Sequence, residues 1–147
     1  MRFRGLSRAL LVRVGLAVLL LSAITATARD GRDFAGNYTL SNVKDQGNTV
    51  QLTMHVRLFN YSDADINGAI ITLMQSRIGA ALYGSFPAVK VWHKGQSITM
   101  SSQFTISKDE YKDWMQPPAQ PNIVVIYQDA TGQTWQRGAQ LMRHPAL

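Results

Sequence analysis

The alternation of residues 50–59 is the feature that most restricts the fold of this chain. Apolar side chains occupy every second position: Val50, Leu52, Met54, Val56 and Leu58. A period of two places all five on one face of a β-strand, whereas helical spacing would scatter them around the cylinder. We therefore predict a strand over residues 50–60 with one face in a core. The other face carries His55, Arg57 and Phe59, and it is a candidate contact surface for a partner.

A second alternating segment, residues 96–106, leads into a predicted helix. Its apolar residues share one face of the expected strand: Ile98, Met100, Phe104 and Ile106. Ser107 and Glu110 then have the spacing of a capping box, with Ser107 as N-cap and Glu110 at the third helical position. Pro117 and Pro118 end this short helix. We expect the helix to cross from one sheet to another.

The remaining segments predict further short strands separated by turn residues. We expect strands at residues 37–43, 69–74, 122–129 and 133–143, and short edge strands near residues 81–86 and 89–92. Sequential strands joined by tight turns form antiparallel sheets. The chain is therefore predicted to be all-β: an antiparallel, two-sheet, immunoglobulin-like sandwich of seven or eight strands with one short helix. A small closed β-barrel is the alternative.

The segment VRLFNYSDADINGAIITL, within residues 50–75, adds a resemblance. It resembles exported fibronectin-III-like and other immunoglobulin-like modules of bacteria, in which a strand often ends in Asn-x-Ser and the next begins with a β-branched residue. The resemblance implies a sandwich architecture and names no function.

The first 28 residues read as a secretory signal peptide. Four arginines precede an apolar run at residues 14–21, and small residues at Ala26 and Ala28 suit a signal peptidase. The apolar run is shorter than the roughly 20 residues that span a bilayer. We expect a flexible lead-in at residues 29–36 and a single domain at residues 37–144, periplasmic or secreted in a bacterial envelope and without a transmembrane span. An uncleaved N-terminal anchor is the alternative.

Composition excludes several classes of function. Four of the fifteen Lys and Arg residues lie in the predicted signal, which leaves eleven basic residues against nine acidic ones. They are scattered and not interleaved with aromatics, so we expect no nucleic-acid partner. The chain has no cysteine, which excludes thiol catalysis, zinc–thiolate sites and iron–sulfur ligation.

The stretch DADING at residues 63–68 matches the opening of an EF-hand loop. Asp63, Asp65 and Asn67 stand at ligand positions, but the twelfth position is Met74, where calcium binding requires a bidentate glutamate. Asp, Asn and Gly also cluster in β-turns because they bond the local backbone and tolerate left-handed conformations. We expect a turn between two strands and no cofactor; a weak metal site assembled with another loop is the alternative.

Catalytic motifs are not evident. His55, His93 and His144 are too widely spaced to predict a metal site, and the chain has no G-x-S-x-G nucleophile elbow. We therefore expect a protein that is not an enzyme.

One further segment contributes a candidate surface. Tyr83, Phe86 and Trp92 lie in an irregular, glycine-containing stretch, where large aromatic rings serve either as core residues or as an exposed ligand surface.

Three hypotheses about function follow. The first is a non-catalytic exported module whose loops or sheet edge bind a protein or an envelope component. The second is a module that binds carbohydrate or another small ligand through Tyr83, Phe86 and Trp92. The third is a small hydrolase with an unrecognised site. The identity of the partner and the oligomeric state are open.

Overall fold

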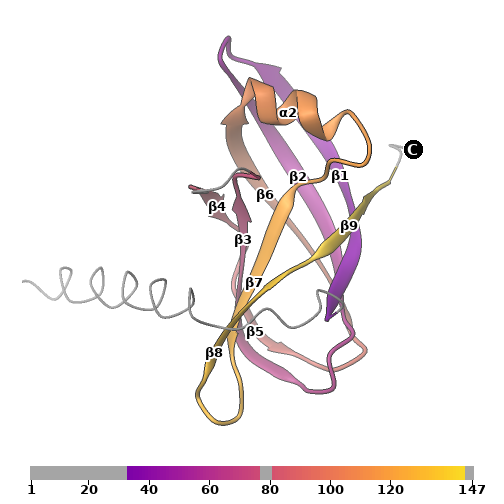
Figure 1. The fold of residues 1–147 in the computed structure, drawn as a ribbon, viewed down its shortest axis with the longest axis vertical. Helices are drawn as coiled ribbons and strands as arrows, with labels where there is room; N and C mark the ends of the chain where they lie inside the picture. The colour runs from indigo at the N-terminus through magenta and orange to yellow at the C-terminus, as the bar shows by residue number, and fades with distance from the viewer. Residues whose placement is uncertain (1–32, 77–80, 145–147) are drawn as a thin grey trace, which may run out of the picture.

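The computed structural model describes residues 33–76 and 81–144 (Figure 1). The predicted signal peptide lies outside the described residues. The elements are β1 (Phe34–Asp45), β2 (Thr49–Asn60), β3 (Ile66–Met74), β4 (Leu82–Ser85), β5 (Val89–Trp92), β6 (Ser97–Ser107), α2 (Lys108–Trp114), β7 (Asn122–Gln128), β8 (Thr134–Gly138) and β9 (Gln140–Arg143). No helix among these residues is long and apolar enough to cross a membrane.

The strands form two sheets that pack face to face. Sheet A has the order β6-β2-β1-β9, and sheet B has the order β4-β3-β7-β8 with β5 also paired to β3. The first, second and sixth strands lie in one sheet and the third, seventh and eighth in the other, which is the arrangement of immunoglobulin-type sandwiches. The predicted two-sheet sandwich is thus confirmed, and the described strands do not close into the alternative barrel.

The C-terminal segment differs from its prediction. We expected one strand over residues 133–143, but it is divided between β8 in sheet B and β9 in sheet A. The amide of Ala139 still donates to Ile123 O of sheet B (2.8 Å), and after it the chain changes sheets. β9 runs parallel to β1, so the described strands number nine and are not all antiparallel.

The N-terminal boundary also differs. Residues 34–36, assigned to a flexible lead-in, belong to β1, and Phe34 is fully buried. Its ring stacks on Trp92 with 5.0 Å between centroids, so the folded domain begins before residue 37. The burial of Phe34 was not predictable from its polar and glycine-containing neighbours. It depends on Trp92, which is nearly sixty residues away in the chain.

The core lies between the sheets and contains the predicted faces of β2 and β6. All five apolar residues of the β2 alternation are at most 2% exposed. Met100, Phe104 and Ile106 of β6 are buried against them, and Ile98 is half-buried. The alternation therefore predicted both the strands and the direction of their side chains.

The predicted helix forms and crosses from β6 in sheet A to β7 in sheet B. Ser107 is its N-cap, and its side chain accepts from the Glu110 amide (3.2 Å). Glu110 is buried; its Oε1 accepts from the amide and hydroxyl of Ser76 (2.9 and 2.6 Å) and its Oε2 from the Tyr83 hydroxyl (3.0 Å). The carboxylate thus fastens the helix to sheet B, which the capping-box spacing did not predict.

Candidate functional site

The predicted aromatic surface does not form. Trp92 is fully buried and Phe86 is 4% exposed, so neither ring is available for stacking on a ligand. Trp92 Nε1 donates to Gln96 O (2.9 Å), and Phe86 packs edge-on against Phe104. Tyr83 is half-buried against the core. Of the two alternatives, the core therefore holds for Phe86 and Trp92, and the ligand surface is wrong for these two rings. Trp92 is turned inward by the pairing of β5 with β3.

The DADING stretch is divided between a turn and a strand. Asp63 and Asp65 lie between β2 and β3, as predicted, whereas Asn67 belongs to β3. Asp65 accepts from the amide of Lys94 (2.8 Å) and contacts His93 Nδ1 (3.0 Å). These two hydrogen bonds, the backbone one foremost, hold the pKa of Asp65 below its usual value. Asp65 thus joins the β2–β3 turn to the β5–β6 turn, and the described residues contain no group of three or more potential metal ligands.

His55, Arg57 and Phe59 share the outer face of sheet A, as the alternation predicted. The Arg57 guanidinium lies 5.1 Å from the Phe59 ring centroid, and that ring stacks on Tyr61 at 5.7 Å. This row of side chains gives one end of the outer face an aromatic and cationic character.

His55 lies between two hydroxyl groups. Its Nε2 is 2.8 Å from Ser41 Oγ on β1, and its Nδ1 is 2.6 Å from Ser101 Oγ on β6. The backbone of β2 is paired on both sides at His55, so the local amides are engaged in the sheet rather than available to stabilise an oxyanion. The arrangement is better suited to linking three neighbouring strands by side-chain hydrogen bonds than to catalysing acyl transfer.

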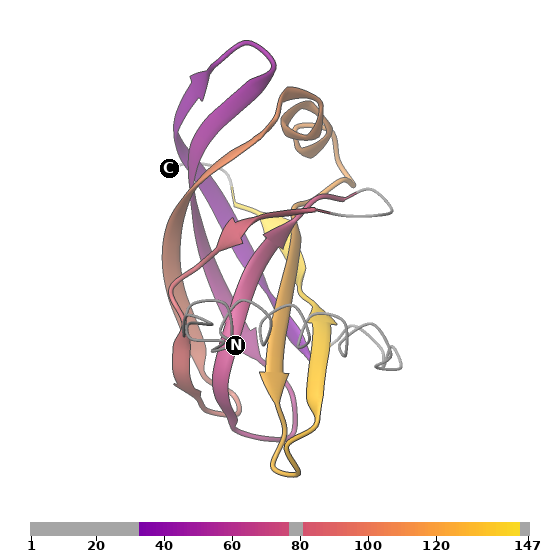
Figure 2. The same cartoon turned by 90° about the vertical axis from the view of Figure 1, so that its left-hand side faces the viewer.

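The free side of β6 is the most unusual feature of the sandwich. β6 ends sheet A, and among the described strands it is paired only with β2. The pairing runs from Thr49 opposite Ser107 to Phe59 opposite Ser97 without a register shift. The strand's sequence, SITMSSQFTIS, has no charged residue, proline or glycine. In Figure 2, β6 runs along the left-hand margin of the molecule.

Two hydrogen bonds define which backbone groups face outward. The Lys108 amide donates to Asn48 O (3.0 Å), and the Asn60 amide donates to Gln96 O (3.1 Å). Gln96 and Lys108 are the even-numbered residues that directly flank β6. Backbone groups alternate in direction along a strand, so the even-numbered residues bond β2. The amides and carbonyls of the intervening exposed residues therefore point to the open edge: Thr99, Ser101, Gln103 and Thr105.

The other described edges carry the usual protection against strand pairing. β4, β5 and β9 have four residues each and β8 has five, and β5 contains Lys90. Beyond its pairing with β9, β1 has a register shift between Ser41 and Lys44, with Asn42 at φ 51°. Short strands, charges and bulges are the devices that keep edges from pairing with other chains. The eleven-residue β6 is not short, charged or bulged. On the side away from β2 it meets, among the described strands, only part of β4: Ser102 Oγ donates to Ser85 O (3.2 Å), and the Ser107 amide donates to the Tyr83 hydroxyl (3.4 Å).

The sequence predicted β6 as a strand but not as an edge. Sheet order depends on pairing between distant segments, and the alternation of apolar residues is the same in central and edge strands. The feature of the sequence that could have drawn attention to this strand is the lack of charged residues over residues 97–107.

Comparison with known proteins adds little. No protein-family model matches the sequence, and no curated protein matches it. A similar solved structure is that of an inactive mutant of the GH20 exo-β-N-acetylglucosaminidase from Vibrio harveyi, with 12% identity and a TM-score of 0.43. The match covers 78% of this chain and spans 19% of that enzyme chain.

Proposed function

We propose that the chain is an exported, non-catalytic binding module that pairs with an extended segment of another exported protein along the open edge of β6. The observation that carries the proposal is the eleven-residue, uncharged edge with a regular register. Export is part of the proposal and rests on the signal-like residues 1–28.

Backbone groups on β6 explain why the partner is a polypeptide. An added strand satisfies alternating amides and carbonyls, which gives affinity without requiring a particular side chain. Selectivity then comes from the outer face, where the β6 side chains are Ser, Thr and Gln. Their neighbours on β2 are His55 and Arg57. A partner strand that presents hydrogen-bonding side chains on this face fits best.

Two glutamines provide a matched test in the full chain. Gln103 lies on β6, and Gln140 lies on β9 at the opposite edge of sheet A; both are exposed. We expect a photo-crosslinking residue at position 103 to yield one dominant adduct in the native host, and the same residue at position 140 to yield none. Equal labelling from both positions would contradict the proposal.

A proline variant tests whether the backbone itself binds. The Thr99 amide points to the open edge, so Thr99→Pro removes one free donor while leaving the β2–β6 hydrogen bonds in place. We expect Thr99→Pro to abolish the adduct formed from position 103 and Thr99→Ala to preserve it. If both variants crosslink equally, the edge is not the binding site. An adduct between two copies of this chain would contradict the proposal of a different partner protein. It would show instead that the β6 edges of two copies pair with each other.

A further inference from the structure

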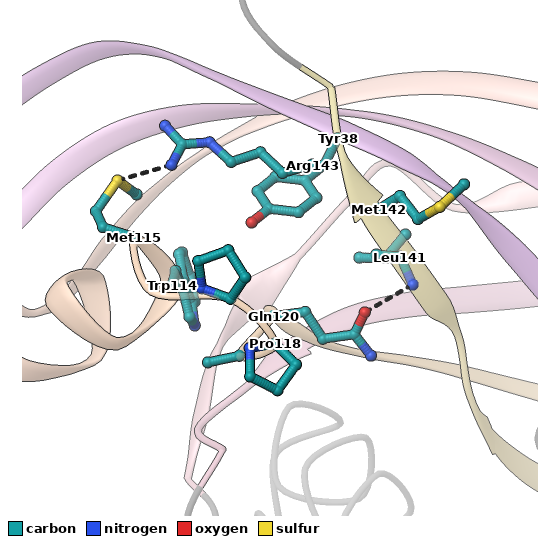
Figure 3. A pocket seen from close by; sticks show the side chains of 10 residues that line it. Tyr38, Trp114, Met115, Pro118, Gln120, Leu141, Met142 and Arg143 are labelled. Carbon is teal, nitrogen blue, oxygen red and sulfur yellow. Dashed lines mark hydrogen bonds between the residues drawn. The ribbon is translucent and has the colours of Figure 1, made fainter.

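A pocket lies at the opposite edge of sheet A from β6. It has a volume of about 280 Å³ and is formed where the α2–β7 connection passes β1 and β9 (Figure 3). The pocket is independent of the proposed strand pairing, because β6 and β9 are the two ends of the sheet order.

The walls of this pocket are mainly apolar. The indole of Trp114 forms one side, and Figure 3 shows the Tyr38 ring opposite with its hydroxyl directed toward Trp114. Pro117, Pro118 and Leu141 are among the other apolar residues of the lining. Aromatic and proline rings present rigid surfaces that pack against the body of a small ligand at little cost in side-chain entropy.

The polar groups of the pocket are hydrogen-bond donors. Arg143 lines it, and its Nη1 donates to the sulfur of Met115 (3.0 Å), a weak acceptor. No Asp or Glu is among the described lining residues, and no described carboxylate forms an ion pair with Arg143. Gln120 accepts from the Leu141 amide through its Oε1 (3.0 Å), so this acceptor is already used within the protein.

Two residues of the lining, Trp114 and Tyr38, carry buried donor groups. Trp114 is 2% exposed, and its Nε1 has no hydrogen-bond partner among the described residues. Burial raises the pKa of the Tyr38 hydroxyl, and the charge of Arg143 opposes that rise. Tyr38 therefore remains a protonated donor at neutral pH.

We propose that the pocket binds a small monocarboxylate with an apolar body. The carboxylate pairs with Arg143 and accepts from Tyr38, and the apolar body lies against Trp114 and the two prolines. Charge complementarity selects the anion, because the lining supplies one full positive charge and no negative one. The volume lies just below the roughly 300–1,000 Å³ of pockets for drug-sized ligands, so the ligand is small.

Three probes that share a phenyl body and differ in charge test the proposal: phenylacetate, 2-phenylethanol and phenethylamine. The readout is the indole N–H resonance of Trp114 in the full chain, assigned with a Trp114→Phe variant. Trp92 and Trp135 are internal controls, because their indole N–H groups are already bonded within the protein. We expect phenylacetate to shift the Trp114 resonance saturably, with at least about tenfold weaker binding of the alcohol and the amine.

Variants of two exposed arginines distinguish the effect of a positive charge in the pocket from the effect of removing a positive charge elsewhere on the protein. Arg143→Gln is expected to weaken phenylacetate binding about tenfold, whereas Arg143→Lys retains most of it. Arg57→Gln, on the outer face of the same sheet, is expected to leave binding unchanged. Equal responses to the three probes, an unchanged affinity in Arg143→Gln, or no response of Trp114 to phenylacetate would each overturn the proposal.

Discussion

The hydroxyl of Tyr83 donates a 3.0 Å hydrogen bond to Oε2 of Glu110, and this bond links sheet B to the crossing helix. The same buried carboxylate accepts two further hydrogen bonds from Ser76. Glu110→Ala removes the acceptor of three part-buried hydrogen bonds, two from Ser76 and one from Tyr83, so we expect it to lower the free energy of unfolding by about 2–3 kcal/mol. Tyr83→Phe removes one of these bonds and should cost about 1 kcal/mol. Urea unfolding measures both values.

The neighbouring Asp109 provides a control for that experiment. It lies in the same helical turn but is exposed, so Asp109→Ala should cost no more than about 0.5 kcal/mol through the helix dipole. An equal loss in Asp109→Ala and Glu110→Ala would show that the helix terminus, rather than the buried hydrogen bonds, carries the stability.

Gly36 marks the closest approach of β1 to β2. A Cβ atom placed there would lie 1.8 Å from the carbonyl oxygen of Arg57, so the two strands cannot keep their spacing around any other residue. We expect Gly36→Ala to lower the free energy of unfolding by more than about 2 kcal/mol.

Gly138 is the matched glycine for this comparison. A Cβ there would meet no atom within 4 Å, and Gly138→Ala should be neutral or stabilising by up to about 1 kcal/mol because it restricts the unfolded chain. Similar losses at both positions in thermal unfolding would contradict the structural distinction.

Asp129 predicts a dependence of stability on acidic pH. Hydrogen bonds, first from the Thr131 hydroxyl and then from the Trp135 indole, lower its pKa from 3.8 to about 2. Because the pKa is lower in the folded state, this contribution is present above pH 3.8 and is lost as the pH falls through about 2. We expect the Trp135 indole N–H resonance to titrate with a midpoint near 2. Thr131→Val should raise that midpoint, and a midpoint that stays unchanged would exclude Thr131 as the main cause.

Phe34 tests where the domain begins. Its burial and its stacking on Trp92 predict that Phe34→Ala costs about 3–5 kcal/mol. Phe59→Ala, on the outer face of sheet A, should cost less than about 1.5 kcal/mol, because the ring is only half-buried and contacts Arg57 and Tyr61 at the surface. If the two variants unfold at the same urea concentration, β1 does not begin at Phe34.

The sequence was sufficient to predict those elements whose structure is determined by a local pattern of residues. The alternation around Met54 predicted β2 and its buried face, and Ser107 predicted the start of α2, because period and capping act between residues close in the chain. Residues whose environment is set by distant segments were not predictable. Trp92 is buried by its pairing with β3 and its contact with Phe34, and nothing within residues 81–92 indicates either partner.

The candidate sites show the same limit. Tyr38, Trp114 and Arg143 lie on β1, on the helix and on β9, and only the crossing of the last strand into sheet A brings them to one pocket. Likewise, the sequence shows that residues 97–107 lack charge but does not show that they form a sheet edge.

The parallel pairing of β1 and β9 has a mechanical consequence. Ala35–Tyr38 lie opposite Gln140–Arg143 and run in the same direction, so the start of β1 and the end of β9 point to opposite ends of the pair. A tensile load applied between those two ends pulls the strands along their own axes and stretches all of their shared hydrogen bonds together. An antiparallel terminal pair would instead open one bond at a time, so this geometry makes the domain resistant to stretching.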